Sequence, residues 1–415
     1  MEKWKEYKIG DLYDVHNGLS KGGEFFGSGY PFLSFKTVFN NYFLPTVLPD
    51  LVQSNEKEQR GYDIKRGDVF VTRTSETSEE LGMSSVALND YPFATYNGFT
   101  KRLRPKDTSI VYPEFIGYYL RSTKFRALFY GFASSMSTRA SLANADLLGM
   151  RVFLPSLEIQ KRIAGILKSL DDKIAVNKKI CENLEAQAHA LFKHWFVDFA
   201  PFKDGKFVES ELGLIPEGWR VGTLSDLGDI VGGATPSKAE SSFFTNKGIP
   251  WLTPKDLSND LGKFTSRGEI DITEEGYNSC SAKIMPRGSV LFSSRAPIGY
   301  LTIAKNSICT NQGFKSVVPK YAGTAYIYYL LKLNTKRIES MSTGTTFKEA
   351  SGALMKSLTV VLPPKSILDD FESKVLEIFN EQEVLETETS CLATLRDTLL
   401  PKLMSGEIKV NEITL

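Results

Sequence analysis

Apolar residues recur at alternating steps of four and three along two stretches of the chain, one near its middle and one near its end. The second stretch matches the first at a shift of 208 residues without a gap. This spacing predicts two long helices that each carry a heptad seam, and about 35 to 43 residues would make each roughly 50–65 Å long. The seam positions are Ile163, Leu167, Leu170, Ile174, Asn177, Cys181, Leu184, Ala188, Leu191 and Trp195 in the first helix, and Phe371, Val375, Ile378, Gln382, Leu385, Thr389, Leu392, Arg396, Leu399 and Leu403 in the second.

The ends of both helices carry sequence signals. Ser156 and Ser366 are expected N-caps, and Asp369 stands at the capping-box distance from Ser366. Pro401 should end the regular part of the second helix, because proline lacks the amide hydrogen that the helix needs.

One heptad helix cannot bury its own seam, and this chain holds two. We therefore expect the helices to form an antiparallel coiled coil, with a globular domain at each end of a rigid bar. Asn177, Gln382 and Arg396 are polar seam positions of the kind that fix the register of a coiled coil at some cost in stability.

The segments outside the helices are duplicated as well. WKEYKIGDLYDVHNG, from Trp4, matches WRVGTLSDLGDIVGG, from Trp219, and NGFTKRLRP, from Asn97, matches QGFKSVVP, from Gln312. The chain is therefore expected to be a tandem duplication with pseudo-two-fold symmetry. Its parts are a first domain (1–154), a central helix and linker (155–205), a second domain (206–362), and a distal helix and tail (363–415).

Each domain combines strands with short helices. Runs such as RGDVFVTRTSE and GSVLFSSRAP are rich in residues that favour strands and are bounded by turn-forming residues. Apolar residues at helical spacing in PEFIGYYLRSTKFRALF and TAYIYYLLKLNTKRIES predict helices. We predict the α+β class for both domains.

The composition is that of a folded protein. With 415 residues, 42% hydrophobic and 24% charged, the chain should form more than one domain. No apolar run has the length of a membrane span and no secretion signal is found, so we expect a cytoplasmic protein. The four cysteines are far apart and are expected to be free buried thiols: Cys181, Cys280, Cys309 and Cys391.

Familiar catalytic patterns are missing from the sequence. Its three histidines, His16, His189 and His194, supply neither a catalytic triad nor a metal site. No P-loop, HExxH or dinucleotide motif is found, nor the DPPY-type tetrapeptide of amino-methyltransferases. The sequence therefore indicates a binding protein with no catalytic residues, metal or cofactor site of its own.

Charge is distributed unevenly along a chain whose total is near zero. Residues 1–154 carry a net charge of +2, residues 206–362 carry +4 and residues 363–415 carry −6. Basic residues alternate with hydroxyl and amide residues on expected loops of both domains, a composition suited to phosphate oxygens and base edges. The alternative is an ordinary solvated surface.

Four segments, in chain order, resemble a known family. They are LPSLEIQKRIAGILKSLDDKI, LFKHWFVDFAPF, GLIPEGWRV and LLPKLMSGEI. Together with the duplication, they are similar to the S (specificity) subunit of type I restriction-modification systems, and the likeness covers essentially the whole chain.

This resemblance implies a function. Each domain would be a target recognition domain for one half of a bipartite DNA site, and the two helices would fix the spacer. The domains differ outside their shared framework, so the half-sites should differ and the whole site should be asymmetric. Methyltransferase (M) subunits, expected to number two, and restriction (R) subunits would be the partners, and S-adenosylmethionine, ATP and Mg would be bound by those partners only.

The residues that contact DNA are expected on corresponding loops of the two halves. Asparagine and glutamine suit adenine, which points to Asn97, Asn311 and Gln312, although a turn beside Gly98 or Gly313 would also explain them. The other candidates are Ser20, Lys21, Arg73, Thr74, Thr138 and Arg139 in the first half, and Ser237, Lys238, Ser294, Arg295, Thr345, Thr346 and Lys348 in the second.

The segment LFKHWFVDFAPF is unusually aromatic. Its rings either pack the end of the first helix onto the second domain or form an anchor for a methyltransferase subunit. The residues concerned are Trp195, Phe196, Phe199 and Phe202.

Two other classes of function, an enzyme that acts alone and a plain scaffold, explain fewer features of the sequence. A nuclease or methyltransferase that acts alone would need the motifs that are missing. A plain scaffold would explain the seam but would not need two different basic domains.

Overall fold

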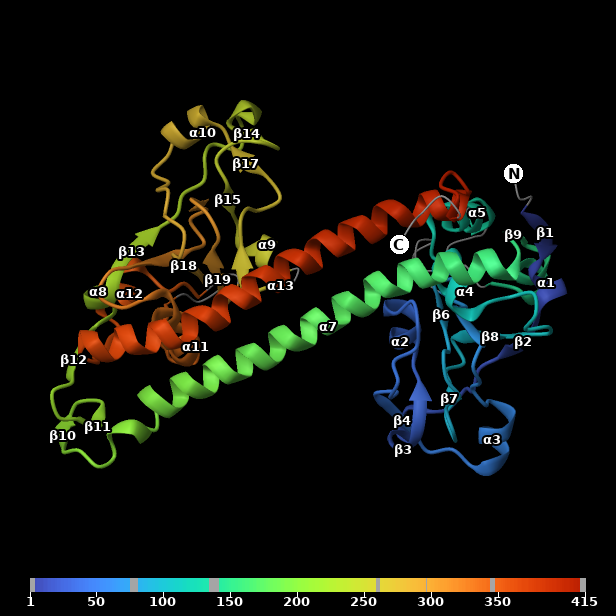
Figure 1. Cartoon of the computed structure of the whole chain (residues 1–415), viewed down its shortest axis with the longest axis horizontal. Coiled ribbons are helices and arrows are strands. Elements are labelled where there is room, and N and C mark those ends of the chain that lie inside the picture. Colours follow the sequence, from blue (N-terminus) through green and yellow to red (C-terminus); the bar gives the residue numbers. More distant parts are fainter. Residues whose placement is uncertain are drawn as a thin grey trace. The chain divides into compact units, whose positions relative to one another are not determined.

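The computed structural model describes residues 4–74, 81–133, 142–258, 262–295, 297–343 and 348–410. The chain forms two compact units, and each long helix is divided between them (Figure 1). The first unit is Met1–Ile174 with Cys391–Leu415, and the second is Ala175–Ser390. We call the globular parts of the two units domain 1 and domain 2.

Domain 1 contains nine strands and six short helices in its described residues. The strands are β1 (Lys5–Lys8), β2 (Tyr13–Asn17), β3 (Phe26–Leu33), β4 (Asp50–Val52), β5 (Val69–Thr72), β6 (Ser84–Val86), β7 (Thr95–Tyr96), β8 (Thr100–Pro105) and β9 (Arg151–Leu154). The helices are α1 (Ile9–Leu12), α2 (Phe35–Asn40), α3 (Glu56–Gly61), α4 (Pro113–Tyr119), α5 (Thr123–Ala133) and α6 (Asn144–Gly149).

Domain 2 follows a hairpin of β10 (Phe207–Ser210) and β11 (Gly213–Pro216). Its described strands are β12 (Arg220–Thr223), β13 (Gly228–Gly232), β14 (Phe244–Thr245), β15 (Trp251–Leu252), β16 (Phe264–Thr265), β17 (Asp271–Ile272), β18 (Val290–Ser294), β19 (Ile298–Ala304), β20 (Cys309–Thr310), β21 (Lys315–Pro319) and β22 (Thr359–Leu362). Its described helices are α8 (Leu224–Leu227), α9 (Pro254–Leu257), α10 (Glu274–Asn278), α11 (Thr324–Met341) and α12 (Gly352–Ser357).

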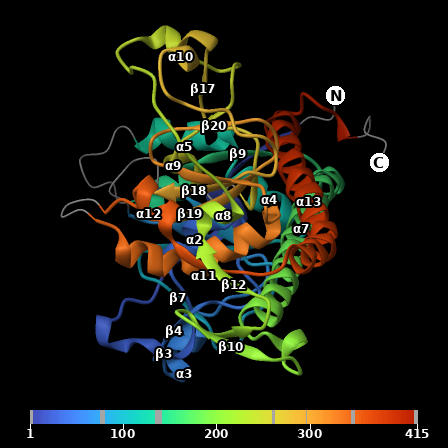
Figure 2. The same ribbon diagram turned by 90° about the vertical axis from the view of Figure 1, so that its left-hand side faces the viewer.

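Each domain contains its own sheet, and the two sheets share the same, mainly antiparallel topology. The strand order is β2-β8-β5-β6 in domain 1 and β13-β21-β18-β19 in domain 2, where β16 joins β19 in parallel. Each domain also has a short parallel pair, β3 with β7 and β15 with β20, and α11 lies across β18 and β19 of domain 2 (Figure 2). The structure therefore confirms the predicted duplication and the α+β class.

The long helices are α7 (Leu157–Phe196) and α13 (Lys365–Ser405). All of the predicted seam residues are buried or half-buried. In the first unit, Arg396 donates to Asp171 at 2.7 Å. In the second, the Gln382 amide donates to the carbonyl oxygen of Cys181 at 3.1 Å. Asp171 precedes Cys181 on α7, whereas their partners follow the reverse order on α13, where Gln382 precedes Arg396. The helices are therefore antiparallel, as predicted.

The seam continues into the core of each domain. In the first unit, Leu167 of α7 and Leu403 of α13 belong to the core of domain 1. In the second, Phe192 of α7 and Phe371 of α13 belong to a core of domain 2. Each domain is therefore held by the start of its own helix and by the end of the other helix.

A buried lysine links domain 2 to both helices. Lys263 is 8% exposed, and its Nζ donates to Glu185 of α7 at 2.6 Å, to Gln382 of α13 at 3.0 Å and to the Tyr329 hydroxyl at 3.1 Å. Its ammonium group also lies 3.6 Å from the centre of the Phe379 ring. Burial lowers the pKa of Lys263 to about 8, although the Glu185 carboxylate acts in the opposite direction.

Two predictions about helix ends were wrong. The helix α13 begins at Lys365, so Ser366 lies inside it, and the Pro364 carbonyl accepts from the amides of Ile367 and Leu368. The same helix continues through Pro401 to Ser405. Burial of the last turn in the core of domain 1 compensates for the hydrogen bond that proline cannot make.

The cysteines are free thiols, as predicted. The prediction that they are buried holds for Cys309 alone, since Cys181 and Cys280 are half-buried and Cys391 is exposed. Across the described part of the chain, no helix is both long enough and apolar enough to cross a membrane.

Candidate nucleic-acid interface

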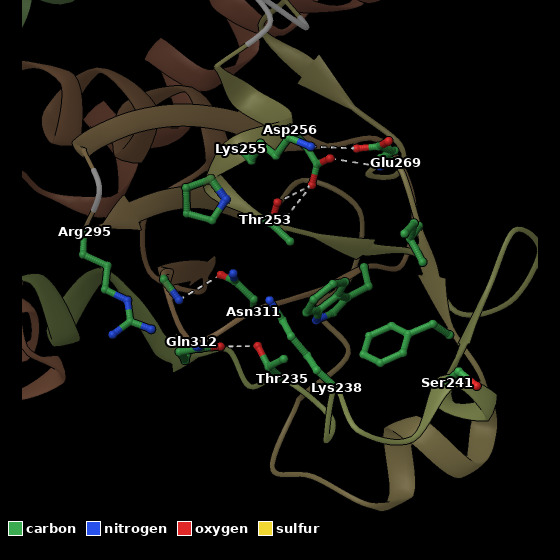
Figure 3. A pocket seen from close by; sticks show the side chains of 15 residues that line it. Thr235, Lys238, Ser241, Thr253, Lys255, Asp256, Glu269, Arg295, Asn311 and Gln312 are labelled. Carbon is green, nitrogen blue, oxygen red and sulfur yellow. Dashed lines mark hydrogen bonds and ion pairs between the residues drawn. The ribbon is translucent and has the colours of Figure 1, made fainter.

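Domain 2 has a hollow of about 730 Å³ that is formed by loops and strand ends from five separate segments (Figure 3). We call it the domain 2 hollow. Its lining residues are Thr235 and Lys238 after β13, Ser241, Phe244 of β14, Trp251 of β15, Thr253 with Pro254, Lys255 and Asp256 at α9, Glu269 and Ile270, Arg295 after β18, and Asn311, Gln312 and Gly313 after β20.

Internal hydrogen bonds fix the walls of this hollow. The Asp256 carboxylate accepts from the amide and hydroxyl of Thr253 at 2.7 and 2.8 Å, and from the amide of Glu269 at 3.0 Å. The Trp251 indole donates to the Ala234 carbonyl at 3.1 Å, and its ring packs on Phe244 with centroids 5.9 Å apart. The hollow is therefore preformed, which lowers the conformational cost of binding a ligand there.

Three cationic side chains line the domain 2 hollow, whose surface is partly apolar. Lys255 makes a loose ion pair with Glu269 at 3.4 Å, and Arg295 makes another with Glu349 at 3.5 Å. The Lys238 side chain points into the hollow beside Asn311 (Figure 3). Lys238 and Lys255 are exposed and Arg295 is half-buried. Solvent-accessible cations with weak partners can exchange those partners for phosphate oxygens or base edges.

The structure brings four of the second-half candidates to one place. Lys238, Arg295, Asn311 and Gln312 all line the domain 2 hollow. Ser294 is fully buried in β18, which removes it from any surface that DNA could touch. The remaining candidates are Ser237, next to the lining residue Lys238, and the exposed Lys348, while Thr345 and Thr346 lie outside the described residues.

The first-half candidates have a different setting. Ser20 is exposed, and Arg73 and Thr74 are half-buried. Lys21 is engaged inside domain 1, because its Nζ forms an ion pair with Glu58 at 2.8 Å. Two further candidates, Thr138 and Arg139, lie outside the described residues.

Asn97 and Asn311 form equivalent turns. The Asn97 side-chain oxygen accepts from the Phe99 amide at 2.7 Å, and that of Asn311 accepts from the Gly313 amide at 2.8 Å. The oxygens are therefore used within the turn, which supports the turn explanation, since a bidentate contact to adenine needs both the oxygen and the NH₂ group. The structural partner of Asn97 is Asn311, one residue before the Gln312 that the repeat suggested.

The equivalence extends beyond the turn itself. The Arg73 amide donates to the Phe99 carbonyl at 2.8 Å in domain 1, and the Ser294 amide donates to the Gly313 carbonyl at 2.7 Å in domain 2. Thr235 corresponds to Ser20, and its hydroxyl contacts the Gln312 side chain. The repeat could have identified Thr235 through Ser20, whereas Phe244 and Trp251 resemble ordinary strand residues in the sequence.

The aromatic segment after α7 packs within the second unit. Phe196 lies 4.8 Å from Tyr326 and 4.9 Å from Phe371, between ring centroids. The rings of Phe199 and Phe202 both contact Trp219, and Trp195 contacts Phe202 and Phe371. All four candidate side chains are half-buried. These contacts support the packing explanation, and their role in docking a partner stays a prediction.

We expect Phe196→Ala to lower the free energy of unfolding of the second unit by about 2 kcal/mol, below the range for a fully buried phenylalanine. Phe199→Ala should cost less, because its ring contacts only Trp219 and Phe207 among the rings described. Urea denaturation followed by tryptophan fluorescence measures both variants. An unchanged stability of Phe196→Ala, together with loss of partner binding, would instead show that this ring is a docking residue.

Comparisons with known proteins agree with this architecture. The family model of the type I restriction modification DNA specificity domain matches residues 1–186 and 216–389, once for each half. The specificity subunit of the type I restriction enzyme HindI from Haemophilus influenzae is 27% identical over 98% of this chain and 100% of its own length.

Two further similarities cover different lengths. The MjaIX specificity subunit from Methanocaldococcus jannaschii is 38% identical over 191 residues, so this chain spans 44% of that relative. The crystal structure of a type I restriction-modification S subunit from M. genitalium superposes with a TM-score of 0.62 over 96% of both chains at 14% identity, which shows a shared fold. Because the family model matches both halves and most of the sequence, this chain belongs to the type I restriction-modification DNA specificity domain family.

Proposed function

We propose that this chain is the DNA specificity subunit of a type I restriction-modification complex. Domain 1 and domain 2 each bind one half of an asymmetric bipartite target, and the antiparallel helices set the spacer between the half-sites. The observation that carries this proposal is the duplication: one framework occurs twice, with different side chains on its equivalent loops.

The chemistry of the domain 2 hollow supports DNA as the ligand. Lys238, Lys255 and Arg295 supply positive charge, and Gln312 and Thr235 supply groups that can donate to or accept from a base edge. Contacts between cationic side chains and phosphates position a protein on DNA, whereas contacts to base edges select the sequence.

The partners and cofactors follow from the same proposal. Two methyltransferase subunits dock on the helix pair, restriction subunits join them, and the assembly works in the cytoplasm. S-adenosylmethionine, ATP and Mg are bound by those partners, and this chain has no catalytic role. The missing catalytic motifs and the names of the relatives support this division of labour.

We expect Arg295→Ala to relax the preference at one position of one half-site by about 1–3 kcal/mol, because arginine makes bidentate contacts with guanine. Loss of the weak pair with Glu349 should leave folding intact. The measurement is selection from randomised duplexes by the complex of this chain with its neighbouring methyltransferase subunit.

Arg220→Ala is the matched control. Arg220 is an exposed arginine of domain 2 on β12, outside the domain 2 hollow. This variant should select the wild-type motif. Uniform weakening by Arg295→Ala at all positions would assign Arg295 to a phosphate, and selection of no bipartite motif by the wild-type complex would refute the proposed function.

A further inference from the structure

The equivalent turns of the two domains differ in the residue that follows them. The two turns make matching hydrogen bonds, in which Asn97 corresponds to Asn311 and Phe99 corresponds to Gly313. Position 99 therefore carries a large aromatic side chain where its counterpart in domain 2 carries none.

Packing explains why Gly313 has no side chain. A Cβ atom at this position would lie 2.8 Å from Cγ of Pro254 and 2.9 Å from the side-chain oxygen of Asn311. The latter oxygen is held in the turn, and Pro254 is fixed at the start of α9. Domain 2 thus keeps this position bare, and Gly313 lines the domain 2 hollow.

Domain 1 leaves the same position open to solvent. Phe99 is 60% exposed. Its backbone is nevertheless fixed, because its amide donates to the side-chain oxygen of Asn97 and its carbonyl accepts from the amide of Arg73. An exposed ring on a rigid turn contributes little to folding, so its apolar surface is available to a ligand.

The neighbours of Phe99 are residues suited to DNA. Arg73 is bonded to it through the backbone, Thr74 follows Arg73, and the Ser20 hydroxyl lies against Gly98. An apolar ring in such a setting needs an apolar group on DNA as its partner. In the major groove that group is the 5-methyl of thymine, which distinguishes a T·A pair from the other pairs without a hydrogen bond.

We propose that Phe99 is a specificity-determining residue of domain 1, where its ring contacts the 5-methyl group of a thymine in the half-site that domain 1 binds. This inference rests on the proposed function. It also gives a physical reason for unlike half-sites, because the equivalent Gly313 cannot make this contact.

The test uses the complex of the full chain with its methyltransferase subunit and duplexes that carry its target. Replacing the contacted thymine by uracil removes one methyl group and should weaken binding by wild type about fourfold. Phe99→Ala should weaken binding to the thymine duplex by a similar factor or more, and should be insensitive to the replacement. Phe99→Leu keeps an apolar contact and should retain part of the discrimination.

Phe93→Ala is the control variant. Phe93 is 64% exposed in the same domain, and it lies before β7 with its ring against Tyr30. It should bind both duplexes as wild type does. The Arg295→Ala variant identifies the half-site of domain 2, so the other half-site is that of domain 1.

Several results would overturn the inference. They are a domain 1 half-site without a T·A pair, equal binding of thymine and uracil duplexes by wild type at every such pair, or persistent discrimination in Phe99→Ala. Discrimination lost equally in Phe93→Ala would also overturn it, since the effect would not belong to the turn. If wild type binds no bipartite target at all, the proposed function itself fails.

Discussion

Replacement of Lys263 by alanine is expected to lower the free energy of unfolding of the second unit by about 3 kcal/mol, the lower end of the range for breaking a buried ion pair. The change removes the cation that bonds Glu185, Gln382 and Tyr329 together. Lys332 still contacts Glu185 at 2.6 Å, which moderates the loss.

Urea denaturation followed by tryptophan fluorescence suits this measurement. Trp195, Trp219 and Trp251 lie in the second unit, and Trp4 alone lies in the first. The double variant Lys263→Met/Glu185→Leu should recover most of the lost stability, because apolar residues can replace both charges. A single Lys263→Ala variant as stable as wild type would show that the cluster does not hold domain 2 on the helices.

The difference in stability between wild type and the single variant Lys263→Met should change with pH in a defined direction. Lys263 has a folded-state pKa of about 8, below its ordinary value of 10.5. Between these values the unfolded chain binds more protons than the folded chain, so the contribution of this group to stability rises with pH. Wild type should therefore gain stability relative to Lys263→Met from pH 8 to pH 10, and a falling difference would contradict burial of the ammonium group.

Insertion of one heptad into both helices is expected to abolish recognition of the original target. The insertion sites are after Ile174 in α7 and after Ser390 in α13, where the boundary between the two units crosses each helix. Seven residues add about 10.5 Å to a helix, which equals roughly three base pairs, or about 100° of DNA twist. Both half-sites can then no longer be engaged together, and affinity should fall by about 10³-fold or more, toward that of non-specific binding.

Insertion into α7 alone is the informative comparison. It leaves the seam of α13 without its partners, so this variant should lose stability as well as recognition, whereas the paired insertion preserves the heptad pattern and should melt normally. Methylation of the unaltered motif by the paired variant would show that the helices do not set the spacer.

The heptad seam and the duplication could be predicted from sequence because both are repeats of residue type along the chain, which are visible without knowing which segments meet in space. The α+β class followed from strand and turn composition. The path of α13 through Pro401 could not be predicted, since it depends on burial of Leu403 in the core of domain 1. The Lys263 cluster was also beyond prediction, because its members are brought together from α7, α13 and domain 2.

The candidate site was only partly predictable for the same reason. Shared loop chemistry singled out Lys238, Arg295, Asn311 and Gln312, which line one hollow. It could not separate the half-buried Arg295 from the fully buried Ser294 beside it, because burial depends on which way each side chain points. Nor could it show that the Asn97 and Asn311 oxygens are used by their own turns.

Mapping of methylated adenines in cells tests the central claim most directly. The chain is expressed with its neighbouring methyltransferase subunit, and host DNA is sequenced by a single-molecule method. We predict one bipartite motif with two unlike half-sites and a gap of fixed length. A single continuous motif, or a stable complex that methylates no defined sequence, would contradict the conclusion that two domains each bind half of the target.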